Sequence, residues 1–445
     1  MPRVGRRVLL ISYYFPPLGG AGVQRSAKFV RYLPDFGYEP VVVTGPGVAG
    51  GRWAPTDATL ASDTSGAREV LRVGTTPPPA SAGRRRRAER WLRAPTPFSR
   101  WWVDGAGAIG AAAPGIDVIY ASMSPFETAE AAARLSQRLR RPWVADLRDP
   151  WALDEMMVYP SRLHRRLERR RMRHALRTAA SIVMNTAEAA AAMRRELGPR
   201  FDRPISWIPN GFDASDFDGA APARDDEAFR IVHTGYFHTE LGLRHRGTAT
   251  LRRVAGGMRT GVDFLGRSHV FLLEALERLT ASRPELRGTV ELHLAGALSD
   301  DDLEVIERSA FRDRVVVHGY LPHAESVGLV RSADLLFFPM HDLPPGTRSL
   351  IVPGKAYEYL ASGRPILAAV PDGDARDLMA RADRVRLLRP RDAAGMARAI
   401  EAEVDHRSDA PAAQRDGVLR EYERRQLTRR LSGVLDAAVE GSPAA

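Results

Sequence analysis

The sequence contains no cysteine and almost no lysine. Without cysteine the chain can form no disulfide, no thiolate nucleophile and no Cys-ligated zinc site, which fits a reducing compartment. Of its 65 lysines and arginines, only Lys28 and Lys355 are lysines. No apolar run reaches the roughly 18 residues of a membrane-spanning helix, and the run at 7–12 is too short for a signal peptide. We therefore expect a cytoplasmic protein without a membrane span.

Positive charge is in excess, with a net charge of +11 at pH 7. Such a balance favours a polyanionic partner, which can be a membrane surface, a nucleic acid or a phosphorylated substrate. Arginine is concentrated in Arg84–Arg87, followed by Trp91, Phe98, Trp101 and Trp102, and in Arg162–Arg177. Basic stretches with exposed aromatic residues dock on anionic lipid. Because no RNA-binding motif is present, we expect no nucleic acid partner and favour peripheral contact with the inner face of a membrane over a merely solvated surface.

The hydrophobic pattern predicts an α/β fold. Short apolar runs alternate with helical periods in both halves, as in βαβ units with parallel sheets. We predict two doubly wound, Rossmann-like domains that face each other across a cleft, at 1–214 and 228–420, and a C-terminal helix at 421–445 that crosses back to the first domain. Two segments have no clear period, a long variable loop at 45–116 and an insertion at 238–266.

The segment YYFPPLGGAGVQR, residues 13–25, follows the first predicted strand. Gly19, Gly20 and Gly22 would let backbone N–H groups approach an anion, and the following helix adds its positive end. A dinucleotide fingerprint is incomplete, because its last glycine is missing and the second strand ends in Thr44 instead of an acidic residue. A nucleotide-sugar diphosphate and a plain glycine turn remain as alternatives.

A second motif is VPGKAYEYLASGRPILA, residues 352–368. Lys355 and Glu358 would share one face at the start of a helix that Pro353 and Gly354 introduce. A lysine at a helix N-terminus can neutralise a diphosphate, and a glutamate one turn later can accept hydrogen bonds from a ribose. The alternative is an ordinary i,i+3 salt bridge on a surface helix.

Several stretches together resemble the family 4 glycosyltransferases of the GT-B class, which are retaining and use nucleotide-sugar donors. The matching residues span nearly the whole chain: 15–25, 117–125, 144–151, 208–213, 316–325, 333–339 and 353–368. The resemblance implies that the C-terminal domain binds the donor and the N-terminal domain the acceptor, with the glycine loop facing the donor diphosphate. It also implies transfer of a hexose-type sugar to a hydroxyl acceptor, which can be lipid-linked, in cell-envelope or exopolysaccharide assembly.

The resemblance also assigns roles to single residues. Lys355 and Arg267 would neutralise the departing diphosphate, with the amides of Gly19 and Gly20. Gly354 and Glu358 would complete the donor site, Glu358 on the ribose, while Gly319 and Tyr320 would cradle the nucleobase.

The chain departs from the family pattern at three places. Arg148, followed by Asp149, stands at a strand end where relatives often have histidine; it would contact phosphate or acceptor, or brace the loop as an Arg–Asp pair. Tyr236 follows Gly235 where relatives have arginine, which moves the cation role to Arg267. Leu350 replaces the first of the two glutamates that relatives often have, so a contact to the donor sugar is in doubt and the identity of the sugar stays open.

We expect no metal and no other cofactor. The DxD patterns at Asp372–Asp374 and Asp216–Asp218 are typical of turns, and we interpret His233 and His318 as packing residues. Two alternatives to a transferase stay open: a nucleotide-sugar 2-epimerase on the same fold, and a degenerate, non-catalytic scaffold that binds membrane or nucleic acid.

Overall fold

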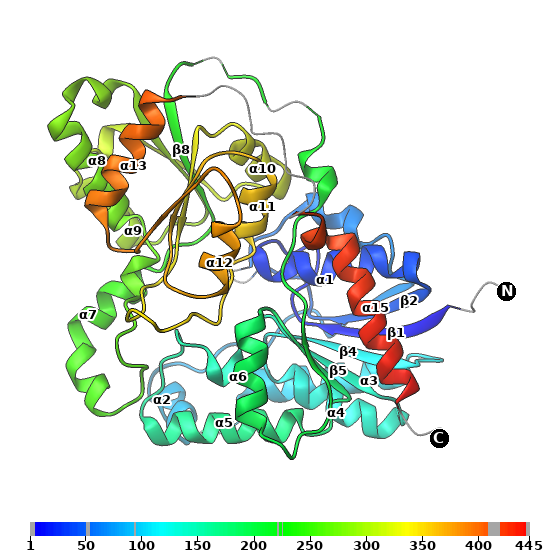
Figure 1. Cartoon of the computed structure of the whole chain (residues 1–445). Coiled ribbons are helices and arrows are strands. Elements are labelled where there is room, and N and C mark those ends of the chain that lie inside the picture. Colours follow the sequence, from blue (N-terminus) through cyan, green and yellow to red (C-terminus); the bar gives the residue numbers. More distant parts are fainter. Residues whose placement is uncertain are drawn as a thin grey trace. The chain divides into compact units, whose positions relative to one another are not determined.

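The computed structural model describes residues 5–49, 54–92, 95–219, 222–224, 226–407 and 419–441, with only the backbone described at 21, 90, 92 and 247–254. The chain divides into two compact units (Figure 1). Unit 1 comprises the residues up to Asn210 together with those from Arg424 onward, and unit 2 comprises Gly211–Glu423. Each unit contains one parallel sheet, so the predicted pair of doubly wound α/β domains is confirmed.

Unit 1 is built on a seven-stranded sheet with the order β3-β2-β1-β4-β5-β6-β7. The strands are β1 (Arg6–Ser12), β2 (Tyr38–Thr44), β3 (Glu69–Arg72), β4 (Val118–Met123), β5 (Trp143–Leu147), β6 (Ser181–Met184) and β7 (Ile205–Trp207). The central strands are buried throughout and mainly apolar, as expected for parallel strands covered on both faces.

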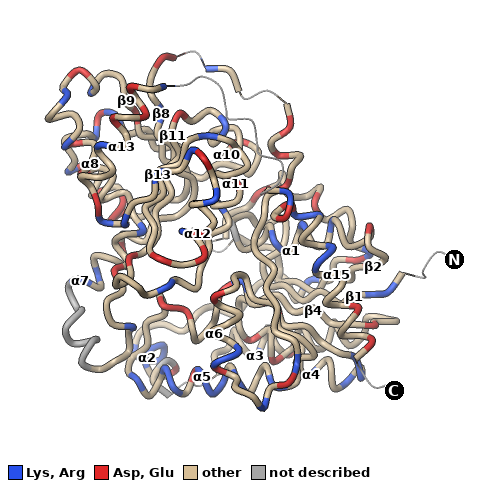
Figure 2. Tube along the Cα trace, viewed as in Figure 1, with Lys and Arg blue, Asp and Glu red and all other residues tan. Residues whose placement is uncertain are grey.

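Helices α1 (Ala21–Tyr32), α2 (Gly83–Leu92), α3 (Pro97–Ala112), α4 (Thr128–Leu139), α5 (Arg162–Leu176) and α6 (Ala187–Leu197) complete the N-terminal part of unit 1. Arginine is dense on α2 and α5 (Figure 2). Of the aromatic residues near the first arginine run, Trp102 is fully buried and donates from Nε1 to Thr128 Oγ1 at 3.0 Å. The sequence interpretation of Trp102 as an exposed aromatic is therefore wrong.

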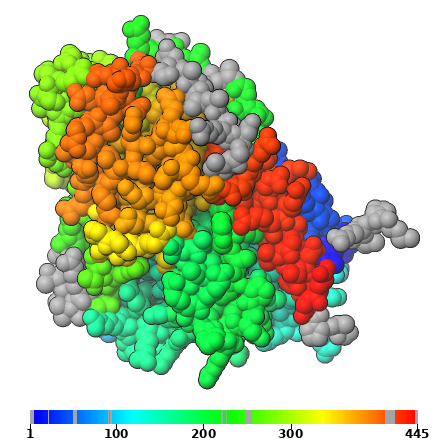
Figure 3. All heavy atoms as spheres, in the orientation of Figure 1, coloured from blue at the N-terminus to red at the C-terminus, as the bar shows by residue number. Residues whose placement is uncertain are grey.

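The C-terminal helix α15 (Arg424–Glu440) belongs to unit 1. Its Leu427, Leu431 and Leu435 are buried in the same core as the strands β1 and β4. Asp436 accepts hydrogen bonds from Arg6 Nη1 at 2.5 Å and Tyr38 Oη at 2.8 Å. In the space-filling view the red helix accordingly lies beside the blue N-terminal segment (Figure 3).

Unit 2 contains a six-stranded sheet with the order β10-β9-β8-β11-β12-β13. Its strands are β8 (Phe229–Thr234), β9 (Val290–Ala295), β10 (Val315–Gly319), β11 (Leu335–Pro339), β12 (Ile366–Ala369) and β13 (Val385–Leu388). Its helices are α7 (Thr239–Val254), α8 (Val270–Ser282), α9 (Asp300–Arg308), α10 (His323–Arg331), α11 (Lys355–Ala361), α12 (Asp374–Ala380) and α13 (Ala393–Asp405). Apolar clusters fill both faces of this sheet.

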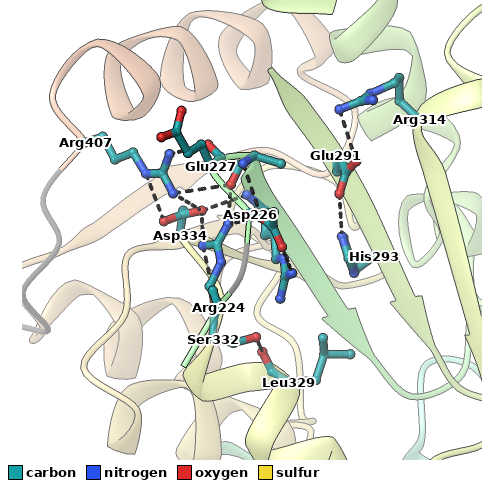
Figure 4. Close-up of polar contacts among 12 residues, drawn as sticks. Arg224, Asp226, Glu227, Glu291, His293, Arg314, Leu329, Ser332, Asp334 and Arg407 are labelled. Atoms are coloured by element: carbon teal, nitrogen blue, oxygen red, sulfur yellow. Dashed lines mark hydrogen bonds and ion pairs between the residues drawn. The ribbon is translucent and has the colours of Figure 1, made fainter. Parts of the chain in front are cut away.

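A polar network closes the amino ends of β8 and β11 (Figure 4). Asp334, which is nearly buried, accepts from Arg224 Nη1 at 2.7 Å, from the backbone N–H of Arg230 at 2.8 Å and from Arg407 Nε at 3.3 Å. Arg224 also pairs with Asp226 at 2.9 Å. Because ligands of open α/β sheets bind at the carboxyl ends of the strands, we interpret this network as structural.

Two predicted irregular segments contain regular structure. The expected loop 45–116 includes β3, α2 and α3, and the expected insertion 238–266 includes α7. Strand β3 is only partly buried at the sheet edge, so it shows no apolar run. The first unit ends at Asn210 instead of the predicted 214, and the second begins at Gly211 instead of 228. Residues 408–418 and 442–445, at the ends of the predicted second domain and tail, lie outside the described residues.

Within the described residues, no helix combines the length and the apolar character that crossing a bilayer requires.

Candidate active site

The strand order of each sheet reverses once, and ligands of open α/β sheets bind beside that switch point. In unit 2 the switch point lies between β8 and β11, which are adjacent parallel strands with connections that run in opposite directions. Four polar or charged residues lie near the carboxyl end of β8: His233, Thr234, Arg267 and Lys355. These four residues define the candidate site of unit 2.

Lys355 is held by a histidine and not by an acid. Its Nζ lies 3.1 Å from Nε2 of His233, while Nδ1 of the same ring lies 2.9 Å from the carbonyl oxygen of Phe337. A carbonyl can only accept, so Nδ1 carries the ring proton and Nε2 accepts from the ammonium. Burial and the nearby Lys355 keep the pKa of His233 well below its usual value, so the imidazole is neutral.

Packing fixes the His233 ring. The side chain is 1% exposed, and it stacks on Phe237 with ring centroids 4.3 Å apart and planes 16° apart. His233 is thus buried as the sequence analysis expected, but its second nitrogen contacts the candidate catalytic lysine. Sequence reasoning missed this contact, because the two residues are 122 positions apart.

Glycines end three neighbouring strands at this edge. Gly235 follows β8 with φ of +102°, and a Cβ there would lie 2.7 Å from Lys355 Nζ. The amide of Gly235 donates to Ala295 at 2.6 Å, and the amide of Gly296 donates to Gly319 at 2.7 Å. Gly319 has φ of +69° and no atom within 4 Å of its Cβ position. Gly235 therefore places backbone without a side chain beside the lysine, and the two neighbouring strands also end in glycine.

The pKa of Lys355 is unusually low for a lysine. Burial, followed by the positive charge of Arg267, lowers its pKa from 10.5 to about 7, and Glu358 opposes the shift. The structure thus brings Lys355, Arg267 and Glu358 close enough to influence one another. Among the described residues Lys355 forms no ion pair, so the i,i+3 salt bridge with Glu358 is absent. A half-buried cation without an acidic partner is a site that an anion would stabilise.

Helix α11 is tied to the strand end by its own residues. Tyr359 Oη accepts from the amide of Thr234 at 2.8 Å, and burial raises the pKa of this phenol. This bond fixes α11, and with it Lys355, against β8. Because α11 spans only seven residues, we assign the positive charge of the site to the side chains and not to a helix dipole.

In unit 1 the glycine loop forms more contacts within the protein than the sequence suggested. The amide of Gly19 donates to the carbonyl oxygen of Pro55 at 2.7 Å, so in this structure it is engaged within the loop and would have to give up that bond to contact a phosphate. Gly20 is the N-cap of α1, with φ of +91°. Gly22 lies against Arg148, whose Nη1 donates to the Gly22 carbonyl and would be 2.4 Å from a Cβ at this position.

Arg148 therefore braces the loop through the Gly22 carbonyl, and its ion pair with Asp149 is long. The guanidinium also lies over the Tyr14 ring at 5.6 Å, while the distance to Asp149 is 3.8 Å, and Asp149 is about half exposed. The buried ion pair of this region is instead between Arg25 and Asp146, at 2.7 and 2.9 Å. Its residues are 121 positions apart, and sequence reasoning missed it.

The DxD patterns are engaged in local contacts. Asp216 Oδ2 lies 2.8 Å from Nε2 of His323, and Asp372 Oδ2 accepts from the amide of Gly346 and lies near Arg389. His318 contacts His293 with 3.0 Å between Nε2 and Nδ1. In the described part of the chain, no group of three or more acidic or histidine side chains is arranged to hold a metal.

Two family models match the chain, each over one unit. The family described as "Glycosyl transferase 4-like domain" matches residues 19–211, and that described as "Glycosyl transferases group 1" matches residues 249–405. The chain belongs to the family 4-like GT-B glycosyltransferases. The two matches place the glycine loop in the first domain of this transferase, and Arg267 and Lys355 in the second.

Solved structures agree with the GT-B fold of this glycosyltransferase. HepE of Anabaena in complex with UDP and glucose has a TM-score of 0.59 and 16% identity, covering 97% of this chain and 100% of that one. Sucrose-phosphate synthase of Thermosynechococcus elongatus has a TM-score of 0.56 and 15% identity, covering 98% and 97%. Trehalose-6-phosphate synthase of Burkholderia multivorans has a TM-score of 0.60 and 13% identity, covering 99% and 100%. No curated protein sequence matches the chain.

Proposed function

We propose that this glycosyltransferase takes a hexose-type sugar from a nucleotide-diphosphate-sugar and transfers it to a hydroxyl acceptor with retained configuration. The observation that carries the proposal is the contact between Lys355 and neutral His233, beside Arg267. A half-buried lysine that forms no ion pair with the described residues, next to a second cation, is arranged to receive a polyanion. The diphosphate of the donor is the polyanion that glycosyl transfer requires.

In this proposal the second domain stabilises the leaving group. Negative charge builds up on the diphosphate as the glycosidic bond breaks, and cations that are already in place lower the barrier most. Lys355 and Arg267 would supply those charges, and Glu358 would accept hydrogen bonds from the ribose. The backbone from Gly319 to Tyr320 would lie against the base. No metal is required, because two cationic side chains take its place.

If the configuration at the anomeric carbon is retained, the donor phosphate has a second role, as a base. An oxygen of the departing phosphate would help to remove the proton from the acceptor hydroxyl, on the face from which the diphosphate leaves. Among the candidate residues of unit 2, Lys355 and Arg267 cannot serve as that base while they are protonated and paired with the phosphate. The first domain would bind the acceptor, and assembly of cell-envelope or exopolysaccharide glycans is the proposed context.

The first donor to test is UDP-glucose. The fold neighbour HepE was crystallised with UDP-glucose and with UDP and glucose, which supports UDP-glucose as the starting compound. Thermal unfolding of the purified protein should be followed with UDP, GDP, ADP and dTDP, with and without EDTA. A ligand at 100 times its dissociation constant stabilises the folded state by about 2.7 kcal/mol. We expect one nucleotide to raise the melting temperature by several degrees, with or without EDTA.

Turnover of the sugar nucleotide then distinguishes a transferase from a 2-epimerase and from a non-catalytic scaffold. A 2-epimerase would convert the sugar nucleotide without any acceptor, and a degenerate scaffold would leave it unchanged. We expect release of the free nucleotide diphosphate that depends on an acceptor and yields a glycoside of the donor's own anomeric configuration. Product of the opposite configuration would refute the retaining mechanism, and no thermal shift with any nucleotide would refute the donor site.

A further inference from the structure

The two most exposed large apolar side chains in the described part of the chain lie on neighbouring helices of unit 1. Trp91, near the end of α2, is 64% exposed, and Leu163, near the start of α5, is 61% exposed. His164 joins the two helix ends. Its ring lies 4.9 Å from the Trp91 ring, and its Nε2 lies 3.1 Å from the Trp91 carbonyl oxygen. The exposed apolar residues therefore belong to one surface.

Both helices carry arginine at helical spacing from these apolar residues. On α2, Arg84, Arg87 and Trp91 follow the i, i+3, i+7 pattern that places side chains on one face. On α5, Leu163, Arg166 and Arg170 follow the same pattern. The opposite face of α5 carries Met172 and Leu176, which are buried. Each helix thus has an exposed stripe of two arginines and one large apolar residue.

The arginines of these stripes form no ion pairs with the residues that the structure describes. They are Arg84, Arg87, Arg166 and Arg170. Neighbouring arginines of α5 behave differently, because Arg173 pairs with Glu196 and Arg171 with Glu127. The exposed stripes therefore keep their positive charge for an external partner. Figure 2 shows how much of α2 and α5 is arginine.

We propose that this surface, formed by Arg84, Arg87, Trp91, Leu163, Arg166 and Arg170, docks on a membrane that contains anionic lipid. Arginines without partners would contact the headgroups, while the indole and the leucine would enter the interfacial layer. A nucleic acid could stack on Trp91 but would gain nothing from an exposed leucine. Leu163 therefore distinguishes a lipid surface from a polyanion in solution. The inference does not depend on the proposed glycosyl transfer.

Vesicle flotation of the full chain tests the apolar part. We expect the protein to float with vesicles of phosphatidylcholine and phosphatidylglycerol, but not with phosphatidylcholine alone, and added salt should weaken binding. The double variant Trp91→Ser, Leu163→Ser should bind at least about tenfold more weakly, given the transfer free energy of two such side chains. The control Leu243→Ser, Leu303→Ser removes two exposed leucines of unit 2, which are 39% and 43% exposed, and should bind normally.

A charge-matched pair of variants tests the electrostatic part. Removing three arginines from the surface should weaken flotation much more than removing three from unit 2, although the net charge falls equally. The first variant is Arg84→Gln, Arg87→Gln, Arg166→Gln, and its control is Arg278→Gln, Arg308→Gln, Arg312→Gln. Circular dichroism checks that each variant is folded. The proposal is overturned if both triple variants bind alike, if Leu163→Ser binds as well as the unmodified chain, or if the chain binds single-stranded RNA but no anionic vesicle.

Discussion

Nζ of Lys355 lies 3.1 Å from Nε2 of His233, whose other nitrogen is committed to the Phe337 carbonyl. The imidazole can therefore orient the ammonium but cannot neutralise it. The other lysine of the chain is arranged in the opposite way, because Lys28 forms a buried ion pair with Asp63 at 2.9 Å. One lysine is thus paired with a carboxylate within the fold, and the other has no carboxylate partner among the described residues, so a bound anion would favour its charged form.

Replacing each lysine by methionine should separate these two roles. Lys355→Met should leave the free energy of unfolding unchanged or slightly raised, because it removes a desolvated charge, but should weaken nucleotide diphosphate binding at least about tenfold. Lys28→Met leaves Asp63 with Arg31 alone and should cost about 3 kcal/mol of stability. Urea unfolding and nucleotide titration measure the two effects. Equal loss of stability in both variants would contradict this distinction.

His233 should act as a positioning residue. His233→Leu removes the acceptor for the lysine, and we expect a roughly tenfold loss of nucleotide affinity from the misplaced ammonium. His233→Gln can still offer a side-chain oxygen to Nζ and should recover part of that affinity. Calorimetric titration of the two variants gives the comparison. If the leucine and glutamine variants bind equally, the hydrogen bond has no positioning role.

Nucleotide binding should depend on pH through Lys355. Its pKa of about 7 in the free protein means that most molecules carry a neutral lysine at pH 8. A bound diphosphate favours the charged form and raises this pKa, so binding at pH 8 should take up close to one proton. Affinity should therefore fall as the pH rises above 7, while His233 stays neutral throughout.

Calorimetry in buffers of different ionisation enthalpy measures that proton uptake, and Lys355→Met should abolish it. The same lowered pKa affects folding in the absence of ligand. Between about pH 7 and 10.5 the unfolded chain binds a proton that the folded chain does not, so this group makes stability rise with pH. A proton uptake that persists in the methionine variant would assign the titration to another group.

Gly235 should tolerate no side chain. A Cβ would lie 2.7 Å from Lys355 Nζ, and the φ of +102° is strained for any other residue. We expect Gly235→Ala to cost about 1–3 kcal/mol of stability and to weaken nucleotide binding by displacing the lysine. Gly288→Ala is the matched control, since no atom lies within 4 Å of its Cβ position. Thermal unfolding with and without nucleotide distinguishes strain alone from loss of the site.

Asp334 should matter for stability and not for the donor. It accepts from Arg224, Arg407 and the Arg230 amide at the amino ends of the strands. Asp334→Ala would leave Arg224 with a poorer partner, and we expect a loss of about 3 kcal/mol. Any nucleotide should still bind with its original affinity to the folded fraction. A selective loss of affinity would show that the network supports the donor site.

The fold could be predicted because parallel strands covered on both faces are continuous apolar runs, as in β4 and β11. Strand β3 was missed because it lies at the sheet edge and is half exposed, and α2 because arginine obscures its period. Lys355 was recognisable because lysine is rare in this chain. The role of His233 was not, since a histidine in an apolar strand resembles a packing residue until the fold brings Lys355 to it.

The amide of Gly19 shows a second limit of prediction from the sequence. Its sequence motif indicated a free anion-binding group, but the amide is bonded to Pro55, a residue in a segment for which no structure was predicted. Spacing identifies groups that are able to bind a phosphate. Only the packing of distant segments decides which of those groups remain available.

Lys355 should receive the diphosphate of a nucleotide-sugar donor. Isothermal titration of UDP and UDP-glucose into the unmodified protein and into Lys355→Met, at pH 7 and without metal, tests this. We expect saturable binding to the first protein and at least about tenfold weaker binding to the second, with both proteins equally folded. Equal affinity of the two proteins for the same nucleotide would contradict it.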